Sequence, residues 1–354
     1  MTAAIDPVIL CTFETVSEPP VMKKIKWGIL STANIGLKYV IPALQKGEFS
    51  TVAAIASRSS GKAQKAASDL GIPRAYGSYE ELLSDPAVDA IYNPLPNNMH
   101  LEWSVKAMEA GKHVLCEKPL AMTVSGAEQM IRARDRAGVK AGEAFMVKSH
   151  PQWIDTRERV RRGEIGDLRL VQGTFSYFNT DPGNIRNIPE LGGGGIWDIG
   201  CYCATMSRWI FEEEPVRLVS LLEFDPEMKT DRLASVIMEF PSGQALFAVS
   251  TQLVRYQRVQ IFGTTGHLEV KIPFNAPDDR PCKVGQDEGD VLLEDYTIHI
   301  YSVTDQYRMM GNEFSRAILE DKGVPVSLED ALYNTRVLTA VFESSRSGKW
   351  VDIV

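Results

Sequence analysis

Three side chains in this sequence could perform proton chemistry together if the fold brought them to one place: Lys118, Asp198 and Tyr202. Lys118 stands in Glu117-Lys118-Pro119, directly after an apolar stretch that reads as a parallel strand. An ammonium group at the carboxyl edge of such a strand lies where open α/β sheets bind ligands. There it can act on a substrate held against a cofactor, so the sequence predicts chemistry at Lys118.

The other two side chains stand in the glycine-rich segment 192–203. Its four consecutive glycines allow very close backbone approach. Asp198 and Tyr202 are spaced i, i+4 and share one face of a helix that begins near Trp197. Because a nearby cation stabilises a phenolate, we expect Lys118 to make Tyr202 a general acid/base near neutral pH. The alternative is that Tyr202 is a core aromatic residue with a satisfied hydroxyl.

A candidate phosphate-binding loop, 28–36, follows the first predicted strand and opens a helix. Such a loop needs small residues so that backbone N–H groups and a helix N-terminus can approach a pyrophosphate. Two glycines of the G-x-G-x-x-G pattern are replaced by Ser31 and Ala33, and only Gly36 is retained. An ordinary strand-to-helix turn is the alternative. The predicted cofactor contacts are Ser31, Thr32, Ala33, Asn34 and Ile35.

The turn after the second predicted strand indicates which dinucleotide would bind. It lacks the acidic residue that accepts hydrogen bonds from the ribose hydroxyls of NAD, and it offers Arg58, Lys62 and hydroxyl groups instead. The guanidinium can stack on adenine while Ser57, Ser59 and Lys62 hold a 2′-phosphate. The sequence therefore predicts NADP(H) in preference to NAD(H), with a solvated loop as the alternative.

The loop 93–100 follows the third core strand, and two prolines stiffen it. A rigid loop at this edge can support the nicotinamide-proximal half of the cofactor. A capping or packing role is the alternative for its histidine. The predicted contacts are Pro94, Leu95, Asn98 and His100.

The pattern of elements predicts two regions. From residue 25 short apolar runs alternate with helical patterns, which is typical of βαβ units in a parallel sheet. After about residue 146, alternating runs of eight or more residues predict a large, mostly antiparallel sheet. We expect an α/β Rossmann-type doubly wound domain and an α+β domain with an open sheet. The predicted bounds are 1–23 for an N-terminal arm, 24–146 for the NADP-binding domain, and 147–354 for substrate binding and oligomerisation.

Composition excludes several functions. The 354 residues carry a formal charge of −8, with a pI near 5.3, and so lack the basic field of a nucleic-acid or acidic-membrane binder. Five cysteines without a C-x-x-C pair argue against a disulfide framework or a metal site. The first 22 residues show no export signal, so we expect a cytoplasmic protein. An uncovered sheet face predicts a homodimer or homotetramer.

Several segments together resemble the glucose-fructose oxidoreductase/inositol dehydrogenase/MocA family. They are the loop ending in Gly36, the run Asn-Pro-Leu-Pro-Asn-x-x-His, Glu-Lys-Pro, Glu-Ala-Phe-Met, and the glycine-rich Trp-Asp-Ile-Gly-Cys-Tyr segment. The resemblance covers residues 24–354. It is greatest to the branch with glucose-fructose oxidoreductase, xylose dehydrogenases and dimeric dihydrodiol dehydrogenase, which has a tyrosine at the position of Tyr202, where much of the family has a histidine.

The resemblance implies hydride transfer between a nicotinamide cofactor and a carbinol carbon of a sugar, polyol or related cyclic alcohol. Lys118 and Tyr202 would act at the reacting oxygen, and Asp198 would position a substrate hydroxyl or Tyr202. Further cofactor contacts are implied for Glu117, Lys118, Arg186 and Trp197. Further substrate contacts are implied for Phe145, Arg186 and Tyr307. A trans-dihydrodiol dehydrogenase, a keto-sugar (anhydrofructose-type) reductase and a non-catalytic NADP-binding regulator remain open.

Overall fold

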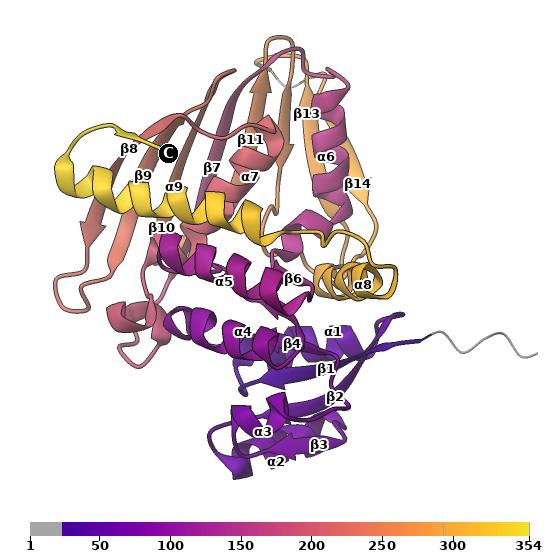
Figure 1. Ribbon diagram of the computed structural model, residues 1–354. Coiled ribbons are helices and arrows are strands. Elements are labelled where there is room, and N and C mark those ends of the chain that lie inside the picture. Colours follow the sequence, from indigo (N-terminus) through magenta and orange to yellow (C-terminus); the bar gives the residue numbers. More distant parts are fainter. Residues whose placement is uncertain (1–22, 293, 354) are drawn as a thin grey trace, which may run out of the picture.

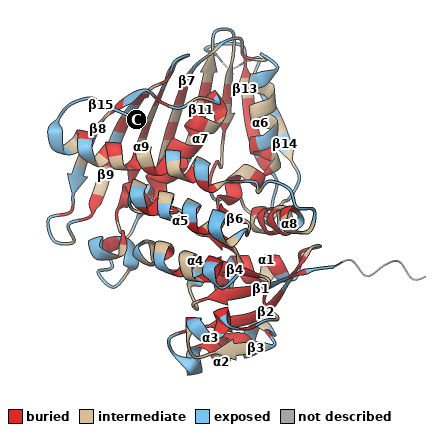
Figure 2. Cartoon of the chain, viewed as in Figure 1, coloured by how far each residue is buried: buried red, intermediate tan, exposed pale blue. Residues whose placement is uncertain are grey.

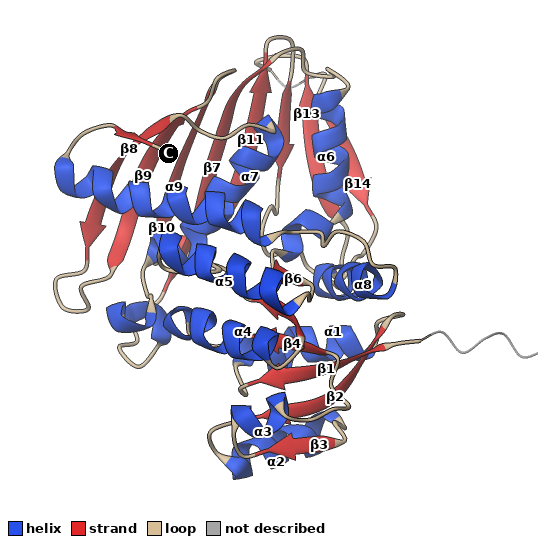
Figure 3. Cartoon of the chain, in the orientation of Figure 1, coloured by secondary structure: helices blue, strands red, loops and turns tan. Residues whose placement is uncertain are grey.

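The computed structural model describes residues 23–292 and 294–353. The predicted N-terminal arm therefore lies, except for Lys23, outside the described residues. The chain forms two sheets with helices packed against them (Figures 1 and 3). None of the helices that can be described has the length and apolar character needed to cross a bilayer.

The first sheet is the expected doubly wound one. Its six strands are all parallel, in the order β3-β2-β1-β4-β5-β6. The strand order reverses between β1 and β4, and this is the crevice where such sheets bind ligands. The strands are β1 (Ile25–Leu30), β2 (Ser50–Ala56), β3 (Arg74–Tyr76), β4 (Ala90–Asn93), β5 (His113–Cys116) and β6 (Ala141–Glu143).

Helices connect these strands, and local sequence signals fix their ends. The Ser78 hydroxyl accepts the Glu81 N–H while the Glu81 carboxylate accepts the Gly77 N–H, a reciprocal capping arrangement that starts α3. A π-helical turn, Gly36–Val40, leads directly into α1 and follows the candidate phosphate loop. The helices are α1 (Ile41–Gln45), α2 (Ser60–Leu70), α3 (Tyr79–Leu83), α4 (His100–Glu109) and α5 (Val124–Ala137).

The second sheet is mixed but mostly antiparallel, as expected. Its nine strands run in the order β14-β13-β12-β11-β7-β10-β9-β8-β15, and only the β7–β10 pair is parallel among the pairs described. The strands are β7 (Leu168–Phe178), β8 (Arg217–Phe224), β9 (Asp231–Glu239), β10 (Gln244–Ser250), β11 (Gln252–Gly263), β12 (His267–Val270), β13 (Cys282–Asp287), β14 (Thr297–Tyr301) and β15 (Val351–Asp352).

Helices α6 (Pro151–Arg161), α7 (Cys201–Phe211) and α9 (Leu328–Ser347) cover one face of this sheet (Figure 1). Alternate strand residues point to opposite faces. Met238 of β9 is accordingly fully buried, whereas its neighbour Ile237 is exposed. Leu221 and Ile300 are further exposed apolar strand residues. The sheet thus presents an apolar face that no helix of the described chain covers.

The closing helices return to the first sheet. In α8 (Gln306–Leu319), Phe314 packs on Trp27 of β1 with ring centroids 5.6 Å apart. The indole N–H of Trp27 donates to the Ser315 hydroxyl at 3.1 Å. One cluster of buried apolar residues includes Trp27 and Phe314 and extends into both sheets, and Figure 2 shows buried residues in both. The domain boundary near residue 146 stays a prediction, because α8 and α9 belong in part to the core of the first region.

Sequence patterns missed three strands, β13, β14 and β15. β13 contains lysine, glycine, glutamine and aspartate, and β14 lies at the edge of the sheet, so neither shows a clean apolar alternation. One of the alternating runs that the sequence predicts after residue 146 extends from Gln244 to Leu253. In the structure β10 ends at Ser250, and the chain turns into β11. A turn without glycine or proline gives no local signal of its position.

Candidate active site

A cavity of about 1180 Å³ lies at the carboxyl edge of the first sheet. The loops that follow β1, β2, β4 and β5 form one wall, and β7, the 181–192 loop and the start of α7 form the other. Its size is sufficient for a dinucleotide and a small substrate. The predicted residues that line it are Ser31, Thr32, Ala33, Asn34, Ile35, Ser57, Arg58, Ser59, Lys62, Pro94, Leu95, His100, Glu117, Lys118, Arg186, Asp198, Tyr202 and Tyr307.

Three predicted residues do not line the cavity. Asn98 is exposed outside it, and its neighbour Asn97 lines it instead, donating its side-chain N–H to the Gly192 carbonyl at 2.8 Å. Trp197 is buried against Phe342, with ring centroids 5.4 Å apart. Phe145 is buried outside the cavity and packs edge-on against the Tyr202 ring, with ring centroids 4.9 Å apart. Their sequence-based roles as direct ligand contacts stay predictions.

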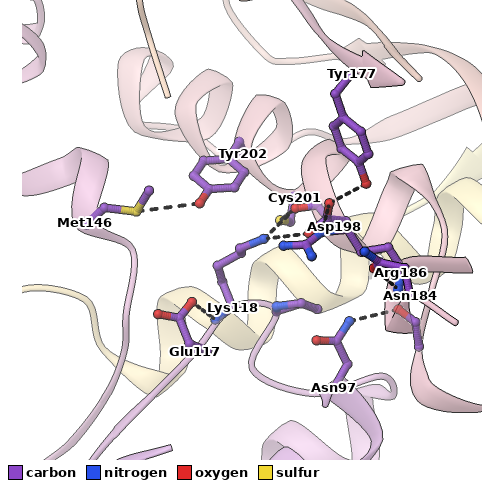
Figure 4. Close-up of polar contacts among 12 residues, drawn as sticks. Asn97, Glu117, Lys118, Met146, Tyr177, Asn184, Arg186, Asp198, Cys201 and Tyr202 are labelled. Carbon is purple, nitrogen blue, oxygen red and sulfur yellow. Dashed lines mark hydrogen bonds and ion pairs between the residues drawn. The ribbon is translucent and has the colours of Figure 1, made fainter. Parts of the chain in front are cut away.

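Lys118 and Asp198 form the charged centre of the cavity (Figure 4). Lys118 Nζ donates to the backbone oxygen of Asp198 at 2.6 Å and to its Oδ1 at 3.3 Å. Asp198 Oδ2 accepts the Tyr177 hydroxyl at 2.7 Å and Arg186 Nε at 2.8 Å. Burial opposes ionisation of this carboxyl, but Arg186 and Lys118 outweigh it and hold the Asp198 pKa well below its usual range. Asp198 is therefore a fixed anion that orients Lys118, not a free base.

Tyr202 meets Lys118 through its ring, not its hydroxyl. Lys118 Nζ lies 4.8 Å from the ring centroid, whereas the hydroxyl points to Met146 Sδ at 3.6 Å (Figure 4). Burial raises the pKa of Tyr202 well above its ordinary value. The expectation that Lys118 would favour the phenolate is wrong for this geometry, because a cation on the ring face does not contact the oxygen. Tyr202 stays protonated and is suited to donate a proton.

Glu117 is held by Tyr92, which the sequence analysis did not single out. The Tyr92 hydroxyl donates to Glu117 Oε1 at 2.6 Å, and the Lys118 backbone N–H lies 3.3 Å from Oε2. Burial raises the pKa of Glu117, although Tyr92 and Lys118 oppose this shift. The side chain therefore has a fixed orientation at the cavity wall beside Lys118.

In the candidate phosphate loop, Ser31 takes the backbone conformation that a glycine would usually adopt at that position. Its φ of +69° lies in the left-handed region, and its hydroxyl accepts the Ala33 N–H at 3.2 Å. A Cβ on Gly36 would only reach ordinary contact, 3.8 Å from Pro94 and Tyr92. The retained glycine is therefore not required by crowding within the protein.

The opposite end of the cavity is cationic. Arg58 and Lys62 line it and are exposed, and neither forms an ion pair within the described parts of the chain. Arg58 lies beside Tyr79, whose pKa is raised by burial and lowered in part by the guanidinium. Two unpaired cations near the start of α2 fit an anionic group such as a 2′-phosphate. Tyr79 carries no motif, so sequence reasoning could not have found it.

His100 holds two loops together. It is fully buried, with Nδ1 2.8 Å from the Pro119 oxygen and Nε2 2.7 Å from the Leu95 oxygen. Burial lowers its pKa to about 4, so the ring is neutral at physiological pH and donates to one of the two carbonyls. These contacts favour the packing role, although the ring also borders the cavity. No group of acidic, histidine or cysteine side chains in the described ranges could hold a metal ion.

Comparison with known proteins identifies the family of this chain. The family model for oxidoreductases with an NAD-binding Rossmann fold matches residues 25–145, and the GFO/IDH/MocA C-terminal domain model matches residues 153–269. The chain belongs to the GFO/IDH/MocA family. The family expected from sequence is thereby confirmed, and the protein is an oxidoreductase acting on CH–OH groups with a nicotinamide cofactor.

Several relatives match more than nine tenths of this chain. An uncharacterized oxidoreductase of Rhizobium meliloti is 42% identical, over 94% of this chain and 100% of its own. The NADP-dependent D-xylose 1-dehydrogenase 2 of Haloferax volcanii is 36% identical, over 92% of this chain and 99% of its own. A 3-ketoreductase from Actinomadura kijaniata, solved with NADP and TDP-benzene, has a TM-score of 0.85 at 26% identity and covers 91% of this chain and 98% of its own. The xylose dehydrogenase matches the branch expected from sequence.

Proposed function

We propose that this protein is an NADP(H)-dependent oxidoreductase that transfers hydride between nicotinamide and a carbinol carbon of a sugar, polyol or related cyclic alcohol. The observation that carries the proposal is that one cavity holds two different groups of side chains at its two ends. Lys118, Asp198 and Tyr202 meet at one end, and Arg58 and Lys62 stand unpaired at the other among the described residues. The NADP-dependent xylose dehydrogenase relative supports the same assignment.

The residues would divide the chemistry as follows. A bound nicotinamide ring supplies or accepts the hydride. The Lys118 ammonium, oriented by Asp198, stabilises negative charge on the substrate oxygen. The protonated Tyr202 would donate its proton to that oxygen during reduction and become a phenolate. In oxidation, the phenolate form of Tyr202 would accept the proton of the substrate hydroxyl. Because burial raises the Tyr202 pKa, the side chain rests in the protonated form, which is the form that reduction requires.

Cofactor choice follows from the cationic end. Ser31 to Ile35 lie at the entrance to the helical segment 36–45, whose first N–H groups suit a pyrophosphate. Arg58, Ser57, Ser59 and Lys62 would then surround a 2′-phosphate on the adenosine ribose. This arrangement supports NADP(H) over NAD(H), because an unphosphorylated ribose would leave both cations unpaired.

A second candidate is a keto-sugar reductase whose substrate carries an anionic group. Arg255 lines the outer wall of the cavity on β11, is exposed, and has no ion-pair partner in the described ranges. A guanidinium there suits a phosphate or diphosphate, as in the nucleotide-linked ligand of the related 3-ketoreductase structure. The raised pKa of Tyr202 keeps the resting side chain protonated, as reduction of a keto group requires.

A spectrophotometric screen tests both candidates. NADP⁺ reduction is measured with aldoses, polyols and dihydrodiols, and NADPH oxidation with free and nucleotide-linked keto-sugars. We expect turnover with NADP(H) in at least one class. Turnover of nucleotide-linked substrates alone, weakened in Arg255→Ala, would select the second candidate. NADPH binding seen by fluorescence without any turnover would contradict both and indicate a cofactor-binding regulator.

The same proposal includes assembly and location. The uncovered apolar face of the second sheet, with Leu221, Ile237 and Ile300 exposed, supports a homodimer or homotetramer formed through that face. Light scattering that returned a 39.3 kDa monomer at micromolar concentration would contradict it. Cys116, Cys201, Cys203 and Cys282 are buried free thiols, which supports a cytoplasmic location.

A further inference from the structure

Asp231 is a buried carboxylate outside the cavity that contacts the helix carrying two of the site residues. It is the first residue of β9 and is 2% exposed. Its Oδ2 accepts the backbone N–H of Ile196 at 2.6 Å. The helix begins at Ile196 with a π-helical turn and continues as α7 to Phe211. Asp231 therefore binds the first residue of the helix on which Asp198 and Tyr202 stand.

The glycine run fits around this carboxylate. A Cβ on Gly194 would lie only 2.0 Å from Asp231 Oδ1, and one on Gly195 would lie 3.3 Å from Oδ2. Gly194 also has φ +116°, a conformation that other residues rarely adopt. The close backbone approach that the glycines permit at these positions is thus to a protein carboxylate. Two of the four glycines are explained by Asp231.

A helix start leaves its first N–H groups without partners inside the helix, and a hydrogen-bond acceptor placed there stabilises the start. Asp231 is anchored in the second sheet, so its bond fixes where the helix begins relative to that sheet. Asp198 and Tyr202 lie within the first two turns of this helix, so their positions relative to the second sheet depend on where the helix starts. A displacement of about 1 Å at a reacting group can reduce a rate by about 10²-fold.

We propose that Asp231 is a positioning residue for the reaction: it fixes the start of the 196–211 helix and thereby the placement of Asp198 and Tyr202 against Lys118. This inference rests on the proposed function for its kinetic consequence. The charged or titratable groups that face Asp231 are Asp198 on the helix and Tyr177 on β7. Burial raises the Asp231 pKa to about 7, with Asp198 adding to the shift, while N–H donors including Ile196 oppose it.

Two variants and one control test the proposal. Asp231→Ala removes the acceptor, and Asp231→Asn keeps an oxygen acceptor without a charge. Asp225→Ala is the matched control, since Asp225 is also a poorly exposed acid beside β9. It accepts from Glu227 and Met228 in its own turn and from Gln252 on β11, and no hydrogen bond joins its side chain to the 196–211 helix among the described residues. We expect Asp231→Ala to lower kcat by about 10- to 100-fold with the Kd for NADPH nearly unchanged. Asp231→Asn should recover most of that loss, and Asp225→Ala should retain kcat.

Hydrogen exchange provides a readout that does not need turnover. The Ile196 amide should exchange faster in Asp231→Ala than in wild type, and it should stay protected in Asp225→Ala. A kcat for Asp231→Ala within about twofold of wild type, or equal losses in Asp231→Ala and Asp225→Ala, would overturn the positioning role. Unchanged exchange at Ile196 would also overturn it. Absence of wild-type turnover would contradict the proposed function only, and the exchange result would still decide the role of Asp231.

Discussion

The two ends of the cavity differ in how their charges are matched. At the catalytic end the Lys118 and Arg186 cations both pair with Asp198, and Tyr177 donates to the same carboxylate. At the opposite end Arg58 and Lys62 have no ion-pair partner among the residues described. The paired cluster is already organised by its own contacts, whereas unpaired cations gain from an anionic ligand. Under the proposed function, the paired end would hold the reacting groups and the unpaired cations would supply binding energy for the cofactor.

The largest effect should come from breaking the catalytic end. Tyr202→Phe removes the proton donor and keeps the ring that packs on Phe145 and Phe175. We expect kcat to fall by about 10² to 10⁴, the usual contribution of general acid–base catalysis, with NADPH affinity retained. Lys118→Met should also lower kcat, because it removes the cation at the substrate oxygen. Near wild-type kcat in Tyr202→Phe with an unchanged pH profile would mean that Lys118 carries the proton and Tyr202 only packs.

The next effect should come from the cationic end. Arg58→Ala should weaken NADP(H) binding by about 1 to 3 kcal/mol, the scale of a charge-assisted hydrogen bond, and should change NAD(H) affinity much less. Fluorescence titration with both cofactors measures this. Lys65→Ala is the control, because Lys65 lies on α2 but pairs with Asp69 and does not line the cavity. Equal wild-type Kd values for NADP and NAD would contradict the assignment.

Protonation of the buried acid Glu143 should change the free energy of unfolding with pH. Glu143 is 2% exposed, and its Oε1 accepts the Leu120 N–H at 2.8 Å. Burial, followed by Asp330, raises its pKa to about 7. The folded state therefore holds this proton more tightly than the unfolded state, and the resulting stability is present below about pH 4.5 and lost as the pH rises through 7.

The comparison with Glu143→Gln isolates that contribution. Between pH 5 and 7 the free energy of unfolding of wild type should fall relative to the variant, by at most about 1.4 kcal/mol for each pH unit. Urea unfolding at several pH values measures both slopes. Parallel slopes for wild type and Glu143→Gln would show that Glu143 does not titrate in this window.

The smallest effect should come from removing one hydrogen bond to Asp198. Tyr177→Phe removes one donor to Asp198, while Lys118 and Arg186 remain bound to it. We expect kcat to fall less than about tenfold, since one hydrogen bond contributes about 1 kcal/mol. Tyr301→Phe is a matched control, because that hydroxyl donates to Asp155 away from the cavity. A loss in Tyr177→Phe as large as that in Tyr202→Phe would make Tyr177 the proton donor.

Local patterns predicted most of the elements and the shared helical face of Asp198 and Tyr202, because strand ends and i, i+4 spacing depend on residues that are close in the sequence. The approach of Lys118 to these two residues was implied by the family resemblance, since 80 residues separate Lys118 from Asp198. Local patterns could not predict Tyr177 or Asp231. Tyr177 is the next-to-last residue of β7 and Asp231 is the first residue of β9, so each gains its partner only when these strands pack on the helix. The raised Tyr202 pKa was also beyond sequence, since it depends on which part of the phenol faces Lys118.

The contact between Trp27 and α8 has a consequence for biosynthesis. Trp27 is completely buried, and Phe314 and Ser315, which cover it, lie far along the chain. During synthesis the strands of the first sheet leave the ribosome before α8 does. Until α8 has been made and packs on them, the Trp27 indole stays exposed to solvent and this part of the core is incomplete. A ribosome-bound fragment ending before residue 306 should therefore remain open to protease attack and chaperone capture, although it contains every strand of the first sheet.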